Sequence, residues 1–462
     1  KCKIYATPFT AVLVKEKFRE KKIDISNYLN IVPLNGSIKL GPFDIEFITL
    51  THSILEPNGL SIKTPSGLIL HTGDWKCDPN PLIGEKINEN RLKEIGEEGV
   101  LAMICDSTNV FNEGRAGSEL DVRESLIKIM ETKTKKIIVT SFASNVARME
   151  TVFYCAKKTN RSICLVGRSM HRIYKAARQC GYMQNLLDPI DPRDAKKIPR
   201  NKIIYLCTGS QGEPMGAMNR IINGTHPDVY MESGDSVIFS SKIIPGNEKK
   251  LYYLQNQITK ANVEIITEEN AFVHVSGHPN REDLKDMYKW VKPNCIIPVH
   301  GEHRHMKEHV DFAKKLQIPK TLLIENGDIV RLYPGKSPQI FDKAPSGRIY
   351  LDGAISVDPE SKSIKERKNL SQNGYLEITL IVTNNGKVKK PVISFKGIPG
   401  EETVQEFIFE MEDEILDICR TFSLENKKQE KNLIELIKQN CRKIIKNKTG
   451  KKPYTNINIA RI

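Results

Sequence analysis

The sequence predicts an α/β protein built from several domains. Its 462 residues exceed the size at which a single hydrophobic core keeps growing. The middle of the chain repeats a unit of strand, short polar turn and helix, which predicts a parallel sheet with helices on both faces. No apolar run approaches the ~20 residues that a bilayer span needs, so we expect no membrane segment.

Residues 1–118 are predicted to form strands joined by tight turns. The runs IEFITLTHS and LSIKTPSGLILHTGD alternate apolar and polar residues, and the second bends at a Pro-Ser-Gly turn. Such alternation around a short turn is typical of a β-hairpin.

From about residue 119 the rhythm changes to strand, turn and helix. A strand ending at Thr140 leads through the turn Ser141–Asn145 into a predicted helix at Val146–Lys158. The next unit passes through Gly-Arg-Ser into a predicted helix at His171–Cys180. Ligands of parallel sheets bind beyond the carboxyl ends of the strands, where these turns lie.

The last third of the chain continues with a helix at Arg281–Val291, a strand at Cys295–Val299 and further strands to about Asp352. The polar and charged stretch 359–374 is predicted to be a linker. A small α/β unit then follows, with helices expected at Glu402–Thr421 and Lys428–Lys446.

Charge and cysteine usage indicate the kind of partner and the compartment. The net charge of +14 suits a polyanion, although the Lys-rich run at 427–452 can equally be a solvated helix face. Ten cysteines without a C-x-x-C pair, most of them in apolar runs, favour free buried thiols in a reducing compartment. We therefore expect a cytoplasmic protein.

Three short motifs place a His or an Asp directly after an apolar strand. They are Thr51-His52-Ser53, His71-Thr72-Gly73-Asp74 and Pro298-Val299-His300-Gly301-Glu302. Imidazole nitrogens bind Zn²⁺ or Mn²⁺, and a carboxylate can bridge two cations. One such His is usually structural, but three motifs of this kind together favour a dinuclear hydrolytic site.

These motifs resemble those of the metallo-β-lactamase superfamily, and the remaining ones are similar to ribonuclease J in its β-CASP branch. The resemblance is carried by CDSTN, SFASN, GRSM, TGSQGE, IPGNE, HVSGH, VHGEHRH, NGDIVRLYPG and GRIYLDG, in the family's order. It implies a four-layer αββα metallo-β-lactamase domain interrupted by a parallel-sheet β-CASP domain. The implied boundaries are 1–118 and 279–358 for the first domain, 119–278 for the insertion, 359–374 for the linker and 375–462 for a small α/β C-terminal domain.

The resemblance also implies roles for particular residues. Two divalent metal ions, zinc or alternatively manganese, are expected on His52, Asp74 and His300, with Asp74 as the bridge. Catalysis is assigned to Asp74 and His278. Asp106 and His71 are expected to orient ligands, and RNA phosphates are expected to contact His274, Ser276, Ser144 and Asn145. Alternatives stay open: His274 and His71 can be structural, and Ser144 and Asn145 can cap a helix.

The family's main ligand motif, His-x-His-x-Asp-His, does not occur in the 462 residues and is expected to precede them. The chain as written is therefore expected to hold metal weakly or not at all, and the implied function belongs to the complete protein.

The implied function is a ribonuclease that cuts single-stranded RNA internally and also degrades it from 5′ to 3′. A homodimer or homotetramer and RNA-degradation partners are further expectations. Two alternatives remain: another metallo-β-lactamase-type hydrolase, or a metal-free RNA-binding or assembly subunit. The ~160-residue insertion with its phosphate-suited turns counts against the first alternative.

Overall fold

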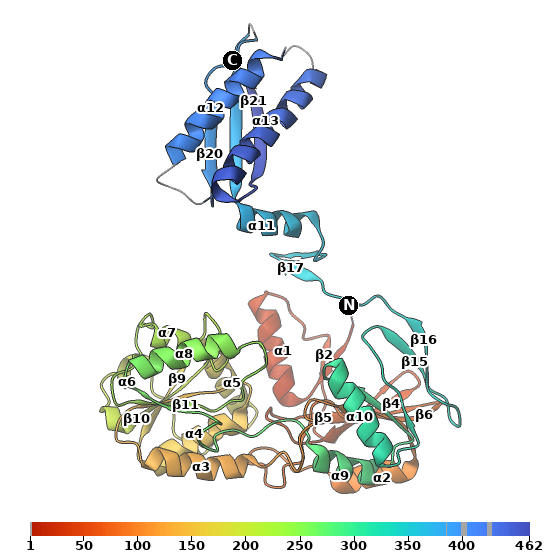
Figure 1. Ribbon diagram of the computed structural model, residues 1–462. Coiled ribbons are helices and arrows are strands. Elements are labelled where there is room, and N and C mark those ends of the chain that lie inside the picture. The colour runs from red at the N-terminus through yellow and green to blue at the C-terminus, as the bar shows by residue number, and fades with distance from the viewer. Residues whose placement is uncertain (1, 385, 399–403, 423–426) are drawn as a thin grey trace. The chain divides into compact units, whose positions relative to one another are not determined.

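The structure of the chain is a computed structural model that describes residues 2–384, 386–398, 404–422 and 427–462 (Figure 1). It divides into two compact units, Lys1–Pro345 and Ser346–Ile462. Both units combine helices with strands, which confirms the predicted α/β class. In the described ranges, no helix is long and apolar enough to cross a membrane.

A seven-stranded sheet organises the first part of unit one, and its strand order explains how an insertion is tolerated. The order is β14-β13-β7-β6-β5-β4-β3. Strands β7 (Val100–Asp106) and β13 (Cys295–Val299) pair in parallel, although the inserted segment separates them in sequence. The chain thus leaves the sheet after β7 and returns beside it. The other strands are β3 (Ser37–Leu40), β4 (Phe43–Thr49), β5 (Asn58–Thr64), β6 (Gly67–His71) and β14 (Lys320–Thr321).

Three helices cover one face of this sheet: α2 (Glu89–Glu98), α9 (Arg281–Val291) and α10 (His303–Lys315). The opposite face carries a smaller apolar cluster that includes Val330 of β15 (Asp328–Arg331). In the part of the chain that the structure describes, strand β15 pairs only with β16 (Gln339–Lys343). Among the described residues, β15–β16 is therefore the strand pair that contributes to this second face, while β1 (Ile4–Ala6) and β2 (Leu29–Ile31) form a separate two-stranded sheet.

The prediction that residues 1–118 contain only strands is wrong. Helix α1 spans Pro8–Glu20, with Pro at its first position and Thr7 before it. Helix α2 begins after Asn88, whose side chain accepts a hydrogen bond from the Arg91 N–H at 3.1 Å. Proline at the first position and Asn as the N-cap are start signals for helices, and the strand-like alternation of the neighbouring segments hid them.

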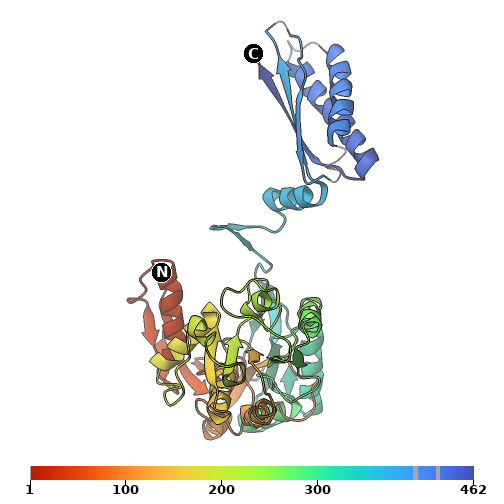
Figure 2. The same ribbon diagram turned by 90° about the vertical axis from the view of Figure 1, so that its left-hand side faces the viewer.

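The inserted segment forms a five-stranded sheet in which every strand pair is parallel, as the strand-turn-helix rhythm predicted. The order is β12-β11-β8-β10-β9, and helices cover both faces (Figure 2). The strands are β8 (Ile137–Thr140), β9 (Ser162–Val166), β10 (Ile203–Cys207), β11 (Ser236–Phe239) and β12 (Glu264–Ile266). One face packs against α3 (Glu119–Glu131), α4 (Val146–Lys158) and α5 (Arg168–Gln179), and the other against α6 (Pro192–Ala195), α7 (Ala217–Ile222) and α8 (Glu248–Lys260).

A buried arginine ties this sheet to the segment that leads back to the first domain. Arg148 on α4 is 0% exposed and binds the Glu119 carboxylate through two nitrogens, each at 3.0 Å. The guanidinium also donates to the backbone carbonyls of Ser240 (2.9 Å) and Val273 (2.8 Å). A buried ion pair is tolerable only when its remaining hydrogen-bonding capacity is met in this way. The arginine therefore holds the start of residues 273–278 against the end of β11.

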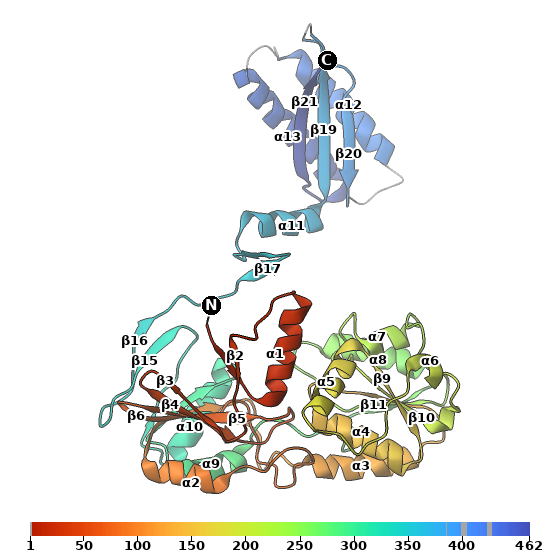
Figure 3. The ribbon, with the colours of Figure 1, turned by 180° about the vertical axis from the view of Figure 1, so that it is seen from behind.

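Unit two contains a three-stranded sheet with β19 (Tyr375–Val382) between β20 (Val392–Lys396) and β21 (Tyr454–Arg461). Helices α12 (Val404–Arg420) and α13 (Lys427–Thr449) pack on one face, and a hairpin, β17 (Tyr350–Asp352) with β18 (Ile355–Val357), precedes them (Figure 3). The predicted helix start at Glu402 lies outside the described residues. The predicted linker contains helix α11 (Lys362–Asn373). None of its residues is buried, so the helix needs no apolar stripe, and the sequence shows none.

Helix α10 is anchored to the sheet by a buried histidine. His309 is 0% exposed, and its ring nitrogens contact the Ser107 hydroxyl (2.9 Å) and the Tyr288 hydroxyl (2.5 Å). Burial lowers the pKa of His309 to about 4, because the charged imidazolium cannot be solvated there.

This buried histidine should make the free energy of unfolding depend on pH. The unfolded chain takes up a proton near ~6.5, whereas the folded chain does so only at lower pH, so stability falls as the pH drops below ~6.5. Between pH 7 and 5, His309→Asn should lose about 2 kcal/mol of the pH dependence seen in wild type. Urea unfolding at both pH values measures this, with His303→Asn at the exposed start of α10 as the control. Equal pH dependence in wild type and His309→Asn would contradict the assignment.

Candidate metal centre

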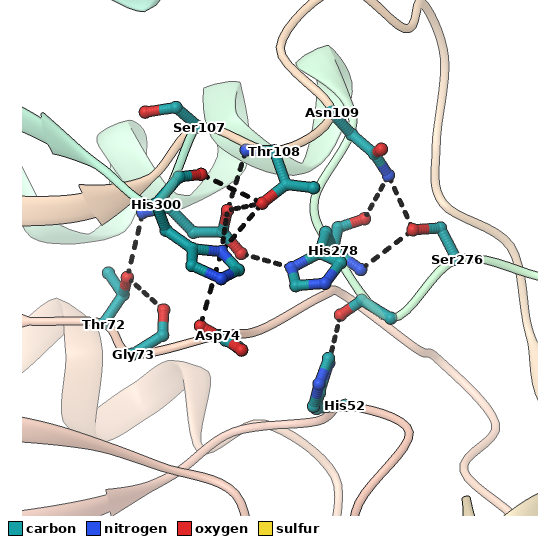
Figure 4. Close-up of polar contacts among 12 residues, drawn as sticks. His52, Thr72, Gly73, Asp74, Ser107, Thr108, Asn109, Ser276, His278 and His300 are labelled. Carbon is teal, nitrogen blue, oxygen red and sulfur yellow. Dashed lines mark hydrogen bonds and ion pairs between the residues drawn. The ribbon is translucent and has the colours of Figure 1, made fainter. Parts of the chain in front are cut away.

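Residues far apart in the sequence meet at the end of the seven-stranded sheet where strands β4, β6, β7 and β13 finish. His52 follows β4, Asp74 follows β6, Asp106 ends β7 and His300 follows β13, while His278 arrives on the returning segment (Figure 4). They form two groups, His52–Asp74–His278 and Asp106–His278–His300, within each of which the potential ligand atoms lie within 4.8 Å of one another. The structure thus brings together the three predicted ligands and the predicted catalytic histidine.

The donor set of this edge fits divalent metal ions. His300 Nδ1 lies 3.6 Å from Asp74 Oδ1, and among the described residues this is the only polar partner of the Asp74 carboxylate. Ligands of one zinc ion lie at most about 4 Å apart, because each bond is ~2.0–2.2 Å long. Small shifts would therefore bring these nitrogens and carboxylate oxygens into coordination distance.

His52 is positioned by a glycine on the returning segment. Its Nδ1 contacts the Gly277 carbonyl at 2.5 Å. A Cβ atom at position 277 would lie 2.4 Å from His52 Cε1, so only glycine permits this approach. Burial lowers the pKa of His52, which keeps the ring neutral and able to bind a cation.

Asp106 joins the two halves of the site. It is 1% exposed, and its Oδ2 lies 2.6 Å from His278 Nδ1 while its Oδ1 lies 3.4 Å from His300 Nδ1. Burial by itself raises the pKa of this carboxyl, but the hydrogen bonds from His278 and His300 outweigh it and hold the pKa well below the usual range. The carboxylate is therefore charged and fixes the orientation of both rings.

His300 stands in a backbone conformation that few residues adopt. Its φ angle is 57°, in the left-handed region. Thr108 Oγ1 lies 2.8 Å from His300 Nδ1 and also donates to Asp106 at 2.7 Å. The hydrogen bond to Asp106 raises the pKa of His300. Backbone strain of this kind, held by surrounding contacts, is common at functional sites.

His278 is oriented by Asp106 on one side of its ring. Because Nδ1 contacts the carboxylate, Nε2 is the nitrogen left to face other groups. The ring lies 5.1 Å from the His52 ring and 5.2 Å from the His300 ring, measured between centroids. It can therefore act either on a substrate or on a cation.

The predicted phosphate contacts on the returning segment lie beside this centre. Ser276 Oγ accepts hydrogen bonds from Asn109 Nδ2 (2.7 Å) and from the His278 N–H (3.2 Å). His274 Nδ1 is buried and has no hydrogen-bond partner among the described residues. Burial, with the positive charges of Arg148, Lys242 and Lys76, lowers the pKa of His274 to about 3. A neutral imidazole next to cations is well placed to meet an anion.

The two predicted contacts on the insertion differ in their surroundings. Asn145 Oδ1 accepts from the Arg148 N–H at 2.9 Å and Nδ2 donates to Glu119 at 3.3 Å, so its side chain caps α4. Ser144 is exposed just before this helix. The capping alternative thus describes what Asn145 does in this structure.

His71 supports the turn that carries Asp74. Its Nδ1 accepts a hydrogen bond from the Gly73 N–H at 3.0 Å. Burial lowers the pKa of His71, so the ring is a neutral acceptor. His71 therefore affects the position of Asp74 indirectly, through the backbone of the turn.

Sequence reasoning did not single out Thr108, Asn109 and Gly277. The first two follow Asp106 in the CDSTN run, and Gly277 lies inside HVSGH. Their presence in these two motifs was the available signal. Their roles depend on contacts across at least 160 residues of sequence, which no local pattern contains.

Comparison with known proteins gives this architecture a class. Residues 134–258 match the "Ribonuclease J, beta-CASP domain" family, and residues 246–321 match the "Zn-dependent metallo-hydrolase RNA specificity domain" family. Residues 362–462 match the "Ribonuclease J C-terminal domain" family. The fold and the site therefore define a metallo-hydrolase of the β-CASP type.

The relatives define the family. Ribonuclease J of Sinorhizobium meliloti is 36% identical over 461 residues, which cover 99% of this chain and 82% of that protein. Ribonuclease J 1 of Streptococcus pyogenes is 37% identical over 80% of this chain, and ribonuclease J of Helicobacter pylori strain J99 is 30% identical over 97%. This chain spans 66% of each of those two relatives. The chain belongs to the ribonuclease J family of metal-dependent ribonucleases.

The central position of Asp106 can be tested in the full-length protein. Asp106→Asn removes the charge that orients His278 and His300, so metal affinity or kcat/KM should fall by about ten- to a hundredfold, as for other groups that orient metal ligands. Steady-state RNA cleavage and metal content measure the two effects. Asp311→Asn is the control, because this half-buried residue of α10 pairs with Lys307 and contacts neither histidine. Unchanged activity and metal content in Asp106→Asn would exclude the orienting role.

Proposed function

We propose that the protein hydrolyses phosphodiester bonds of single-stranded RNA, cutting internally and also degrading from a 5′-monophosphate end. The observation that carries this proposal is the convergence of His52, Asp74 and His300 beside a segment rich in phosphate-suited groups. The family matches do not favour the two rival functions, a metal-free RNA-binding subunit or a hydrolase of another substrate class.

The centre would hold two divalent ions, zinc or manganese, with His52 and His300 on different ions and Asp74 between them. When bound, the ions would supply positive charge that stabilises the attacked phosphate and would make a water more acidic. The chain's own groups then have separate tasks. Asp106 holds the His278 ring through Nδ1, and Nε2 can deliver a proton to the leaving oxygen.

The 5′ end would be read by His274 and Ser276. Both residues belong to the segment 273–278, whose start is held by the hydrogen bond from Arg148 to the Val273 carbonyl. The same segment carries His278. The neutral imidazole of His274, which lies near Arg148 and Lys242, and the Ser276 hydroxyl would accept a terminal monophosphate and crowd out a triphosphate. Ser144 is expected to contribute from the helix start.

The setting and the assembly of the protein are part of the same proposal. The ten cysteines are all free thiols, which suits the reducing cytoplasm. A homodimer or homotetramer, together with partners in RNA degradation, is expected from the family resemblance.

The bridging role predicts that cleavage and RNA binding separate. In the full-length protein, Asp74→Ala should reduce RNA hydrolysis by about a thousandfold or more, because several kcal/mol of charge stabilisation is lost. The Kd for RNA should change by less than about threefold, since backbone phosphate contacts dominate affinity. Gel assays of labelled RNA and fluorescence anisotropy measure the two quantities, with Asp44→Ala as the control. Retained cleavage at controlled metal concentration would rule out the two-metal mechanism.

The end-reading role predicts a difference between substrates. Loss of one hydrogen bond to a charged group costs roughly 1.5–3 kcal/mol, which is about ten- to a hundredfold in rate. His274→Ala with Ser276→Ala should slow digestion of 5′-monophosphorylated linear RNA by that factor and slow cleavage of circular RNA much less. Time courses on both substrates provide the measurement. Equal losses would show that the two residues serve the scissile phosphate or the fold.

A further inference from the structure

A cavity lies on the inserted domain, where α5 and α7 begin, and none of the candidate metal or end-reading residues lines it. Its volume is about 770 Å³, within the range of ~300–1,000 Å³ that is usual for small-ligand sites. Helix α1 stands beside α5 in opposite views (Figures 1 and 3) and contributes Glu20 to the wall. The polar side chains of the wall are Arg168, Ser169, His171, Arg172, Thr208, Arg220 and His226, together with Glu20.

The cations of this cavity are arginines, although most basic residues of the chain are lysines. Of the 70 Lys and Arg residues only 20 are Arg, yet three arginines and no lysine line the cavity. The planar guanidinium donates two parallel hydrogen bonds to a phosphate, which the ammonium of lysine cannot do. The choice of residue therefore indicates a phosphoryl group more specifically than positive charge does.

These arginines are little neutralised by the protein. Arg172 pairs with Glu20 at 3.4 Å. Arg220 donates only to the backbone carbonyl of Thr225, at 3.4 Å, and Arg168 has no hydrogen bond or ion pair among the described residues. The cavity thus has a net positive charge and free donors.

Neutral donors complete the wall. His226 Nδ1 accepts hydrogen bonds from the N–H groups of Asp228 (3.2 Å) and Val229 (3.1 Å), which leaves Nε2–H as the donor of the ring. Gly167 precedes α5 with φ of 114°, and a Cβ there would lie 2.6 Å from Thr208 Oγ1. The glycine lets the start of α5 approach the turn after β10, so that backbone N–H groups border the same space.

The strand register of the five-stranded sheet shows where this cavity lies relative to the segment that carries His274. Thr140 pairs with Cys207 and Cys207 with Val166, so the turns after β8, β10 and β9 share one edge. Adjacent strands are ~4.8 Å apart, which puts the β9 turn about 10 Å from the β8 turn. On the other side of β8, Ser240 at the end of β11 binds the Val273 carbonyl, next to His274. A polyanion that follows these strand ends from the side of His274 would therefore reach the cavity.

We propose that this arginine cavity binds a phosphate group carried by a nucleoside, at a site separate from the metal centre. Two sources share that chemistry: a phosphodiester of the RNA substrate, a few nucleotides from the bond that is cut, or a free nucleotide. The first source rests on the proposed ribonuclease function, and the second does not. Met215, 87% exposed at the rim, offers an apolar surface for the base.

The test uses Arg168→Gln with Arg220→Gln in the full-length protein, with EDTA present so that no cleavage occurs. Each lost contact to single-stranded RNA should reduce the slope of log Kd against log salt by about 0.7, so the double variant should lose about 0.7–1.4. Its Kd for a short single-stranded RNA should rise about tenfold at low salt. A second arm titrates AMP by calorimetry. Lys175→Gln, exposed on α5, is the control, and Arg168→Lys with Arg220→Lys should restore binding only in part.

The two arms separate the two sources. A changed salt slope for RNA identifies the RNA backbone as the ligand, and lost AMP binding with an unchanged RNA slope identifies a free nucleotide. Unchanged binding of both ligands, in a variant whose thermal unfolding midpoint matches wild type, overturns the proposal. Because no metal is present, a failure here is independent of whether the protein cleaves RNA.

Discussion

The contact between the Asp106 carboxylate and the His278 imidazole is the interaction on which the rest of the site depends. The carboxylate ends the strand after which the chain leaves the first domain, and the imidazole stands where the chain returns. The same carboxylate reaches His300 on the neighbouring strand. A single buried charge therefore closes the insertion and orients two histidines, and its negative charge persists because both rings donate to it.

A second buried charge holds the two ends of the insertion against its own sheet. Arg148 on α4 binds Glu119 at the start of the insertion and also the backbone carbonyl of Val273 near its end. Buried ion pairs add little net stability when they are fully satisfied, but they penalise any arrangement that separates the partners. The pair thus fixes the start and the end of the insertion relative to its own sheet. The short segment from Val273 to His278, which contacts Asp106, therefore leaves the insertion from a defined place.

The parallel sheet of the insertion presents all its polar turns at one edge. The helix-cap role of Asn145 stabilises one of these turns, while the arginine cavity occupies the other end of the edge. This division is expected of parallel sheets, in which helix starts and strand ends coincide and supply unpaired N–H groups. Helix capping and the proposed phosphate binding would then use the same local geometry at different turns.

The sequence by itself determined the α/β class, the parallel insertion, helices α4 and α9 to the residue, and the identity of most polar groups at the metal centre. These follow from local periodicity and from motifs a few residues long. It did not reveal α1 and α2, which lie among strand-like runs, or α11, which has no buried face and hence no clear apolar period. The roles of Thr108, Asn109 and Gly277, and the meeting of three arginines in one cavity, depend on contacts between distant segments. Only the tertiary structure decides such contacts, since they depend on strand order and register.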